Sequence, residues 1–85
     1  MPSSSRIREQ IADIIGRPRN VRFSEIKRIM DQLNATERTA AHGQLFNVNG
    51  RRVMINKHNN GKETIPKYSV DEFRDAMIDL GWYED

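Results

Sequence analysis

Residues 44–55 read QLFNVNGRRVMI, two apolar runs joined by Asn49-Gly50. Asn and Gly readily adopt the positive φ angles of a type I′ turn, so this segment predicts a β-hairpin with a two-residue loop. In that register Val48 lies opposite Arg51. Because side chains alternate along a strand, the hairpin has one apolar face and one mixed face. The apolar face is the core candidate and carries Phe46, Val48, Val53 and Ile55, whereas the mixed face carries Asn47, Arg52 and Met54.

Two amphipathic runs precede the hairpin. The first covers residues 6–15 with apolar positions at helical spacing, and Gly16 predicts its end. The second follows Ser24, whose hydroxyl we expect to cap the helix. The connector between them, residues 17–22, is rich in arginine and proline, and we expect it to be too polar for the core but accessible to RNA.

The segments beside the hairpin complete the predicted fold. Residues 36–39 are expected to add a first strand. After the hairpin, Ser69 and Glu72 predict a capping box that opens a last helix, and Gly81 predicts its end. The element order is therefore α, α, β, β, β, α.

This order predicts an α+β protein with a three-stranded antiparallel sheet covered on one face by two helices. That is the α-β-β-β-α shape of a double-stranded-RNA-binding domain (dsRBD), here with an extra N-terminal helix. We assign residues 1–20 to an N-terminal extension and residues 21–85 to the dsRBD-like domain.

The composition narrows the class of protein. The 85 residues include no cysteine, which excludes disulfides, thiol nucleophiles and cysteine-based zinc sites and fits a reducing compartment. No run approaches the ~18 apolar residues that a membrane helix needs, so we expect a cytoplasmic protein without membrane contact. The two histidines are too far apart in sequence for a strong metal signal, and we expect neither metal nor cofactor.

The charges are distributed unevenly. Residues 1–67 hold 13 of the 14 Lys and Arg residues, whereas residues 71–85 hold six acidic residues and one cation. The loop after the hairpin, residues 56–62, reads NKHNNGK and is cationic and rich in hydrogen-bond donors. This asymmetry favours a polyanion on the hairpin side, although a solvated helix face explains the acidic end equally well. The candidate phosphate-binding residues are Arg51, Arg52, Lys57, His58 and Lys62.

His42 is the candidate for chemistry, because it lies among small residues just ahead of the hairpin. Imidazole exchanges its proton near neutral pH, so it can take the proton from a ribose 2′-hydroxyl and start attack on the adjacent phosphodiester. Neighbouring Arg or Lys would stabilise the developing charge. The plain alternative is a surface histidine without a role.

Several segments together resemble the HicA family of toxins over roughly residues 21–82. They are VRFSEI at 21–26, a histidine-containing strand that ends in Phe46, GRRVMINKH at 50–58, Lys62-Glu63, and DLGW at 79–82. The amphipathic run before residue 21 is similar to the additional first helix of longer members.

The resemblance implies a dsRBD-like fold, cleavage of mRNA that arrests growth, and neutralisation by a HicB-type antitoxin that covers the active site. It implies no metal. Where the family has Gly-Ser-His, this chain has Ala41-His42-Gly43, and alignment on Phe46 puts Gly43 in the place of the family's histidine. His42 fills that place only if the strand shifts by one residue, which a bulge at Gly43 would allow.

Three functional hypotheses follow. The first is a HicA-like ribonuclease in which His42 is the acid or base. The second is a noncatalytic dsRBD-like protein that binds RNA without cleaving it. The third is a protein-interaction module that pairs with a partner through its sheet.

Overall fold

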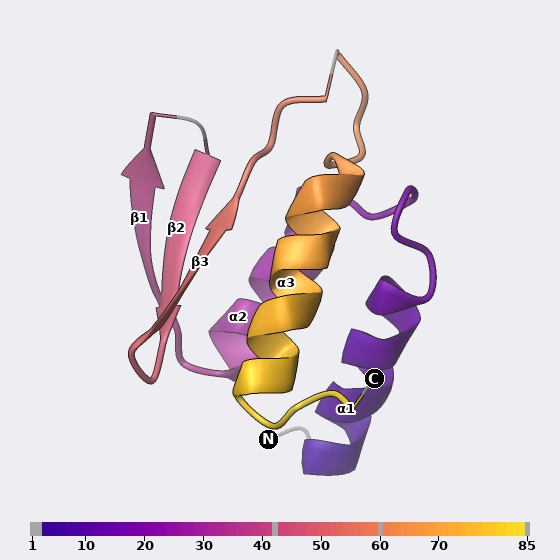
Figure 1. The fold of residues 1–85 in the computed structure, drawn as a ribbon, viewed down its shortest axis with the longest axis vertical. Coiled ribbons are helices and arrows are strands. Elements are labelled where there is room, and N and C mark those ends of the chain that lie inside the picture. The colour runs from indigo at the N-terminus through magenta and orange to yellow at the C-terminus, as the bar shows by residue number, and fades with distance from the viewer. Residues whose placement is uncertain (1–2, 42, 60, 85) are drawn as a thin grey trace.

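The computed structural model describes residues 3–41, 43–59 and 61–84. These residues form an α+β fold with three helices and an open three-stranded antiparallel sheet in the order β1-β2-β3, as predicted (Figure 1). The helices are α1 (Ser4–Ile15), α2 (Phe23–Gln32) and α3 (Lys67–Asp79), and the strands are β1 (Thr36–Ala40), β2 (Gly43–Val48) and β3 (Arg51–Ile55).

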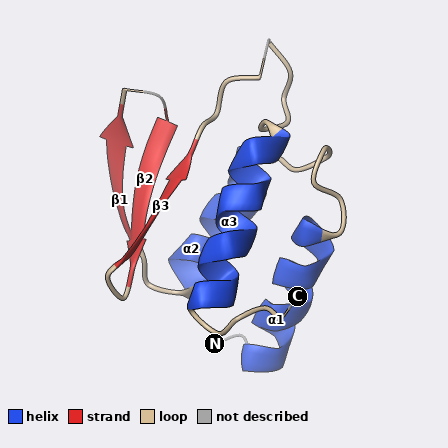
Figure 2. Ribbon diagram, in the orientation of Figure 1, coloured by secondary structure: helices blue, strands red, loops and turns tan. Residues whose placement is uncertain are grey.

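The helices all lie on one side of the sheet. Helix α3 packs on β3, and α1 contacts both α2 and α3. Figure 2 shows α2 and α3 between the sheet and α1, so that α1 forms an outer layer. The other face of the sheet is left uncovered by the described residues.

The β2–β3 hairpin has the predicted register. Its pairs run without interruption from Gln44 opposite Ile55 to Val48 opposite Arg51. Asn49 and Gly50 have φ angles of 51° and 87°, as a type I′ turn requires. The predicted first strand is also present, and it extends one residue further, to Ala40.

One hydrophobic core joins all three helices to the sheet. The four residues predicted for the apolar hairpin face are each 2% exposed or less. Helix α1 contributes to the same core rather than lying outside it. Its buried residues are Ile7, Ile11 and Ile14, those of α2 are Ile26, Ile29 and Met30, and the apolar ones of α3 are Val70, Phe73, Ala76 and Met77.

Two predictions about the α1–α2 connection are wrong. Helix α2 begins at Phe23, so Ser24 lies inside its first turn, and the Glu25 carboxylate instead accepts from the Arg22 amide at 2.8 Å. The connector also contributes to the core, because Val21 is fully buried and its carbonyl accepts from the Ile65 amide at 2.8 Å. The arginines around this single valine mask it in a composition-based reading.

The predicted capping box of α3 is wrong as well. The helix begins at Lys67, directly after Pro66, which places Ser69 within the first turn. Ser69 is 1% exposed; its hydroxyl accepts from the Asn56 amide at 3.0 Å and donates to the Asn56 carbonyl at 3.3 Å. The serine therefore joins the end of β3 to α3. The predicted end is confirmed, since Gly81 has a φ of 80° just past the helix.

Candidate nucleic-acid interface

The uncovered side of the sheet carries a row of polar, cationic and apolar side chains, which we call the open face. Arg38, Leu45 and Met54 lie side by side across the three strands, and Thr36, Asn47 and Arg52 form the neighbouring row. None of the six is acidic. All except Met54, together with Glu37, line a shallow hollow. Arg52 and Met54 are exposed, as the hairpin pattern predicted.

Among the described residues the two open-face arginines have no carboxylate partner, in contrast to Arg51 next to them in sequence. Within the described ranges, neither Arg38 nor Arg52 forms an ion pair. Arg51 points the other way along the strand: its Nε bonds Asp79 Oδ2 at 2.9 Å, and its Nη1 lies 3.9 Å from Glu72 Oε1. Strand alternation therefore separates two neighbouring candidates, Arg52 facing outward and Arg51 tied to α3.

The loop between β3 and α3 (residues 56–66), which we call the loop end, is held by its own polar groups and by the α1–α2 connector. Asn59 Nδ2 donates to the Thr64 carbonyl at 3.2 Å, and the His58 amide donates to Asn56 Oδ1 at 2.8 Å. Thr64 also forms a β-bridge with Arg22. In Figure 1 this loop, the connector and the start of α3 lie at the same end of the molecule.

The loop end gathers the remaining candidate cations. Lys57 Nζ lies 4.4 Å from the centroid of the Phe23 ring, so the ammonium makes a cation–π contact with the first residue of α2. His58 and Lys62 are exposed and form no ion pair among the described residues. Lys62, Arg19 and Lys67 line one hollow, although Lys67 also pairs with Asp71 at 2.9 Å.

Arg38 was not among the predicted RNA-contacting residues, and Arg19 was predicted to be accessible to RNA only as part of the connector. Arg38 could have been found from the pattern, since it holds the alternate position of the predicted first strand and pairs with Leu45. Arg19 reaches the loop end only because residues 21 and 65 meet, which no local pattern indicates.

His42 lies outside the described residues. Its neighbour Gly43 pairs with Ala40, and the β1–β2 register continues from there to Thr36 opposite Asn47 without a bulge. The bulge at Gly43 that would shift the strand by one residue is therefore not seen in the described strands. Gly43 has a φ of 153°, and a Cβ added there would lie 2.1 Å from the Ile55 carbonyl oxygen. Position 43 consequently has no room for a side chain of any kind.

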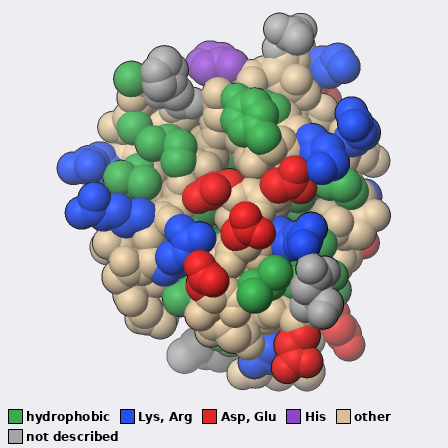
Figure 3. All heavy atoms as spheres, in the orientation of Figure 1, with side chains coloured by type: hydrophobic (Ala, Val, Ile, Leu, Met, Phe, Trp, Pro, Cys, Tyr) green, Lys and Arg blue, Asp and Glu red, His purple; other side chains and the backbone are tan. Residues whose placement is uncertain are grey.

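Acidic side chains gather over α3, away from the open face. Figure 3 shows them near the centre of the viewed side, with cations on both flanks. The helix carries Asp71, Glu72, Asp75 and Asp79. The basic-to-acidic asymmetry along the sequence thus becomes an asymmetry between surfaces, and α3 would repel a polyanion that the open face attracts.

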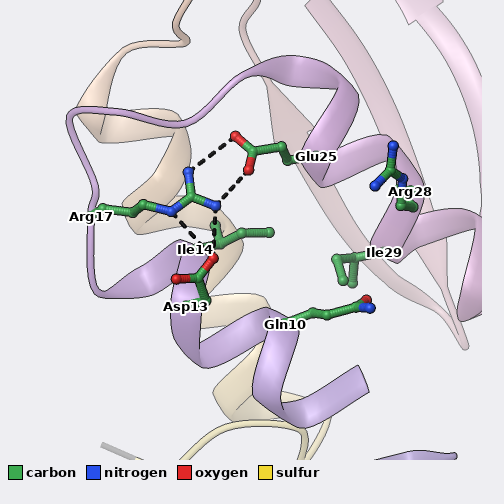
Figure 4. A pocket seen from close by; sticks show the side chains of 7 residues that line it. All are labelled: Gln10, Asp13, Ile14, Arg17, Glu25, Arg28 and Ile29. Carbon is green, nitrogen blue, oxygen red and sulfur yellow. Dashed lines mark hydrogen bonds and ion pairs between the residues drawn. The ribbon is translucent and has the colours of Figure 1, made fainter. Parts of the chain in front are cut away.

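A further hollow lies between α1 and α2, and internal ion pairs join three of its four charged side chains, Asp13, Arg17 and Glu25 (Figure 4). Arg17 Nη2 donates to Glu25 Oε1 at 2.5 Å and to Asp13 Oδ2 at 2.9 Å. The hydrogen bond to Arg17 lowers the pKa of Glu25, and the same carboxylate raises the pKa of Arg17 above its already high value. Arg17 therefore joins two helices and is not offered to phosphate.

The described residues contain no group of three or more His, Asp or Glu side chains arranged to hold a metal ion. None of the described helices is long and apolar enough to cross a membrane. No family model, curated protein or solved structure gives a significant match to the chain.

Proposed function

We propose that this protein is a HicA-like toxin, a ribonuclease that binds RNA on its open face and loop end. In this proposal α2, the sheet and α3 form a dsRBD-like unit, and α1 is an additional helix. A HicB-type antitoxin would neutralise the protein by covering the same cationic surface.

The unpaired arginines of the open face are the observation that carries the proposal. Arg38 and Arg52 have no carboxylate partner among the described residues, and Glu37, which lines the same hollow, pairs with Lys27. Arg17, Arg22, Arg51 and Lys67 are each matched to an acid. A guanidinium without an internal ion pair can turn toward a phosphate without breaking a contact, and it presents several hydrogen-bond donors. Lys62 and His58 extend this surface around the loop end.

His42 is the residue that we propose for acid–base chemistry. Its imidazole would accept the 2′-hydroxyl proton as the 2′-oxygen attacks the phosphorus, and nearby cations would stabilise the pentacoordinate transition state. The bond from phosphorus to the 5′-oxygen then breaks, which leaves a 2′,3′-cyclic phosphate and a 5′-hydroxyl that takes its proton from the imidazolium or from water. In the alignment on Phe46, Gly43 stands in the place of the family's histidine and has no room for a side chain, so we propose the adjacent His42 for this role.

The same observation favours a second candidate function, noncatalytic RNA binding. Because β1 and β2 pair without a bulge, position 42 keeps a one-residue offset from the place of the family's histidine. A chain with this offset could keep the RNA-binding face and lack cleavage.

Salt-dependent binding tests the RNA-binding part. The affinity for a single-stranded RNA should fall as salt rises, because phosphate contacts release counterions. Arg52→Ala should weaken binding about five- to tenfold and lower the salt slope by about one unit. Arg51→Ala is the matched control, since Asp79 already engages Arg51, and it should leave the slope unchanged. Equal effects of both substitutions would remove the open face as the RNA site.

His42→Ala separates the two candidate functions. We expect the wild-type protein to cleave RNA in the presence of a chelator and His42→Ala to bind RNA without cleaving it. Growth arrest on expression should disappear with the same substitution. Cleavage by both forms would contradict the role of His42, and binding without cleavage by the wild type would leave the noncatalytic function.

A further inference from the structure

A second exposed surface lies where the open face meets α3. Met54 and Tyr68 are the two large apolar side chains exposed in the described part of the chain, at 36% and 59%. With Asn56 and Glu72 they line one hollow of about 460 Å³, within the size range of small-ligand sites. An aromatic ring, a thioether, an amide and a carboxylate thus converge on one place.

The tyrosine ring is held in position although it is exposed. Asn56 Nδ2 donates to the Tyr68 hydroxyl at 2.5 Å, and Ser69 clamps the Asn56 backbone. The ring is therefore fixed by the end of β3 rather than by core packing, and its orientation is set before any partner arrives. A fixed exposed ring loses little side-chain entropy on stacking.

The negative charge around the hollow favours a neutral ligand group over an anionic one. Glu72 lines the hollow, and Asp75 follows three residues later on the same helix, so a phosphate there would be repelled. Arg52 is two residues before Met54 on the same strand face and attracts phosphate beside the hollow. A nucleotide would therefore place its base in the hollow and its phosphate toward the sheet.

We propose that the hollow lined by Met54, Asn56, Tyr68 and Glu72 binds an unpaired nucleobase, which stacks on the Tyr68 ring. The inference rests on the proposed RNA binding and adds a preference for single-stranded over duplex RNA, because a paired base has no free face or edge to offer. A protein partner fits less well, since two apolar side chains separated by polar ones do not make the apolar centre of a stable interface.

A single-stranded RNA with one 2-aminopurine tests the proposal on the full chain. Stacking on Tyr68 should quench its fluorescence on binding. Tyr68→Ala should abolish the quenching and weaken binding by about five- to a hundredfold. Tyr68→Phe, which keeps the ring but loses the hydroxyl that Asn56 contacts, should retain the quenching and bind more weakly than the wild type. Inorganic polyphosphate, which has no base, should bind Tyr68→Ala and the wild type equally.

The possible failures are distinguishable. If the wild type binds RNA in a salt-dependent way but Tyr68→Ala matches it in affinity and quenching, the base site is overturned and RNA binding stands. If Tyr68→Ala weakens duplex and single-stranded RNA equally, the preference for an unpaired base is overturned. If no RNA binds, both the base site and the proposed function fail. Thermal unfolding within a few degrees of the wild type shows that a variant has folded.

Discussion

Gly43 is the residue on which the geometry of the sheet depends most closely. Its backbone passes so near β3 that an added Cβ would meet both the Ile55 carbonyl and the Asn56 Cα, at 2.1 and 2.8 Å. Backbone atoms in a paired strand cannot move aside without breaking the ladder. The glycine is thus required by the space beside it as well as by its φ of 153°.

Gly43→Ala should therefore lower the free energy of unfolding by about 2–4 kcal/mol, since it combines a steric clash with backbone strain. Gly50→Ala is the matched control: its φ is 87°, but no atom lies within 4 Å of the added Cβ. At position 50 only the strain of a positive φ angle remains, which should lower the free energy of unfolding by about 1 kcal/mol. Urea titration of both variants measures the difference, and similar midpoints would show that β3 does not crowd position 43.

At the scale of elements, the junctions are made by buried or half-buried polar side chains. Ser69, in the first turn of α3, bonds the backbone of Asn56, the residue directly after β3. Arg17, just after α1, bonds Glu25 in the first turn of α2. Both contacts join segments that would otherwise meet only through apolar packing, which is weakly directional. The polar contacts therefore set the angles at which the elements meet.

The Arg17–Glu25 junction should make stability depend on pH. The pKa of Glu25 is lowered in the folded state, so the unfolded chain binds the proton more readily. The Arg17–Glu25 contact therefore adds to the free energy of unfolding above pH 4.5, the ordinary pKa of glutamate. This contribution is lost as the pH falls through the lower pKa that Glu25 has in the folded protein. Glu25→Gln should lower the free energy of unfolding by at most about 1 kcal/mol at neutral pH. It should also make the decrease of this free energy below pH 4.5 less steep.

Denaturant titrations between neutral pH and about pH 3 measure this effect. Glu63→Gln provides the control, because Glu63 pairs with Arg22 through side chains that are 80% and 65% exposed. In that variant the free energy of unfolding should decrease at acid pH as it does in the wild type. The same decrease in Glu25→Gln would contradict the role of the junction.

At the scale of the whole molecule, α1 belongs to the common core. Ile7, Ile11 and Ile14 pack with residues of α2 and α3, and Arg8 reaches the other end of the chain. Its Nη1 donates to the Gly81 carbonyl at 2.8 Å, and its guanidinium lies 5.0 Å from the centroid of the Trp82 ring. The additional helix thus contacts both the second helix and the C-terminal turn.

Ile11→Ala should lower the free energy of unfolding by about 2–5 kcal/mol in a single cooperative transition, because it leaves a cavity in a core that all the helices share. Ile15→Ala, at a half-buried position one turn further on, should cost clearly less. Two separate transitions, or equal costs, would indicate that α1 folds apart from the rest.

The local features of the fold could be predicted from the sequence, because they depend on neighbours along the chain. Asn49-Gly50 determined the turn and register, and alternation determined which side chains of β3 point outward. Helix starts were less predictable: Ser24 and Ser69 carry the side chains of good caps, but Glu25 and Pro66 are what open the helices.

The cationic surface could be predicted only in part, because it depends both on neighbours along the chain and on contacts between distant segments. The sequence by itself determined that Arg51 and Arg52 face opposite ways. Only the tertiary structure decided that Arg51 meets Asp79, 28 residues away, that Ser69 holds Asn56, and that β3 leaves no room beside Gly43. Strand alternation is a property of consecutive residues, whereas pairing of charges and available volume depend on which distant segments the core brings together.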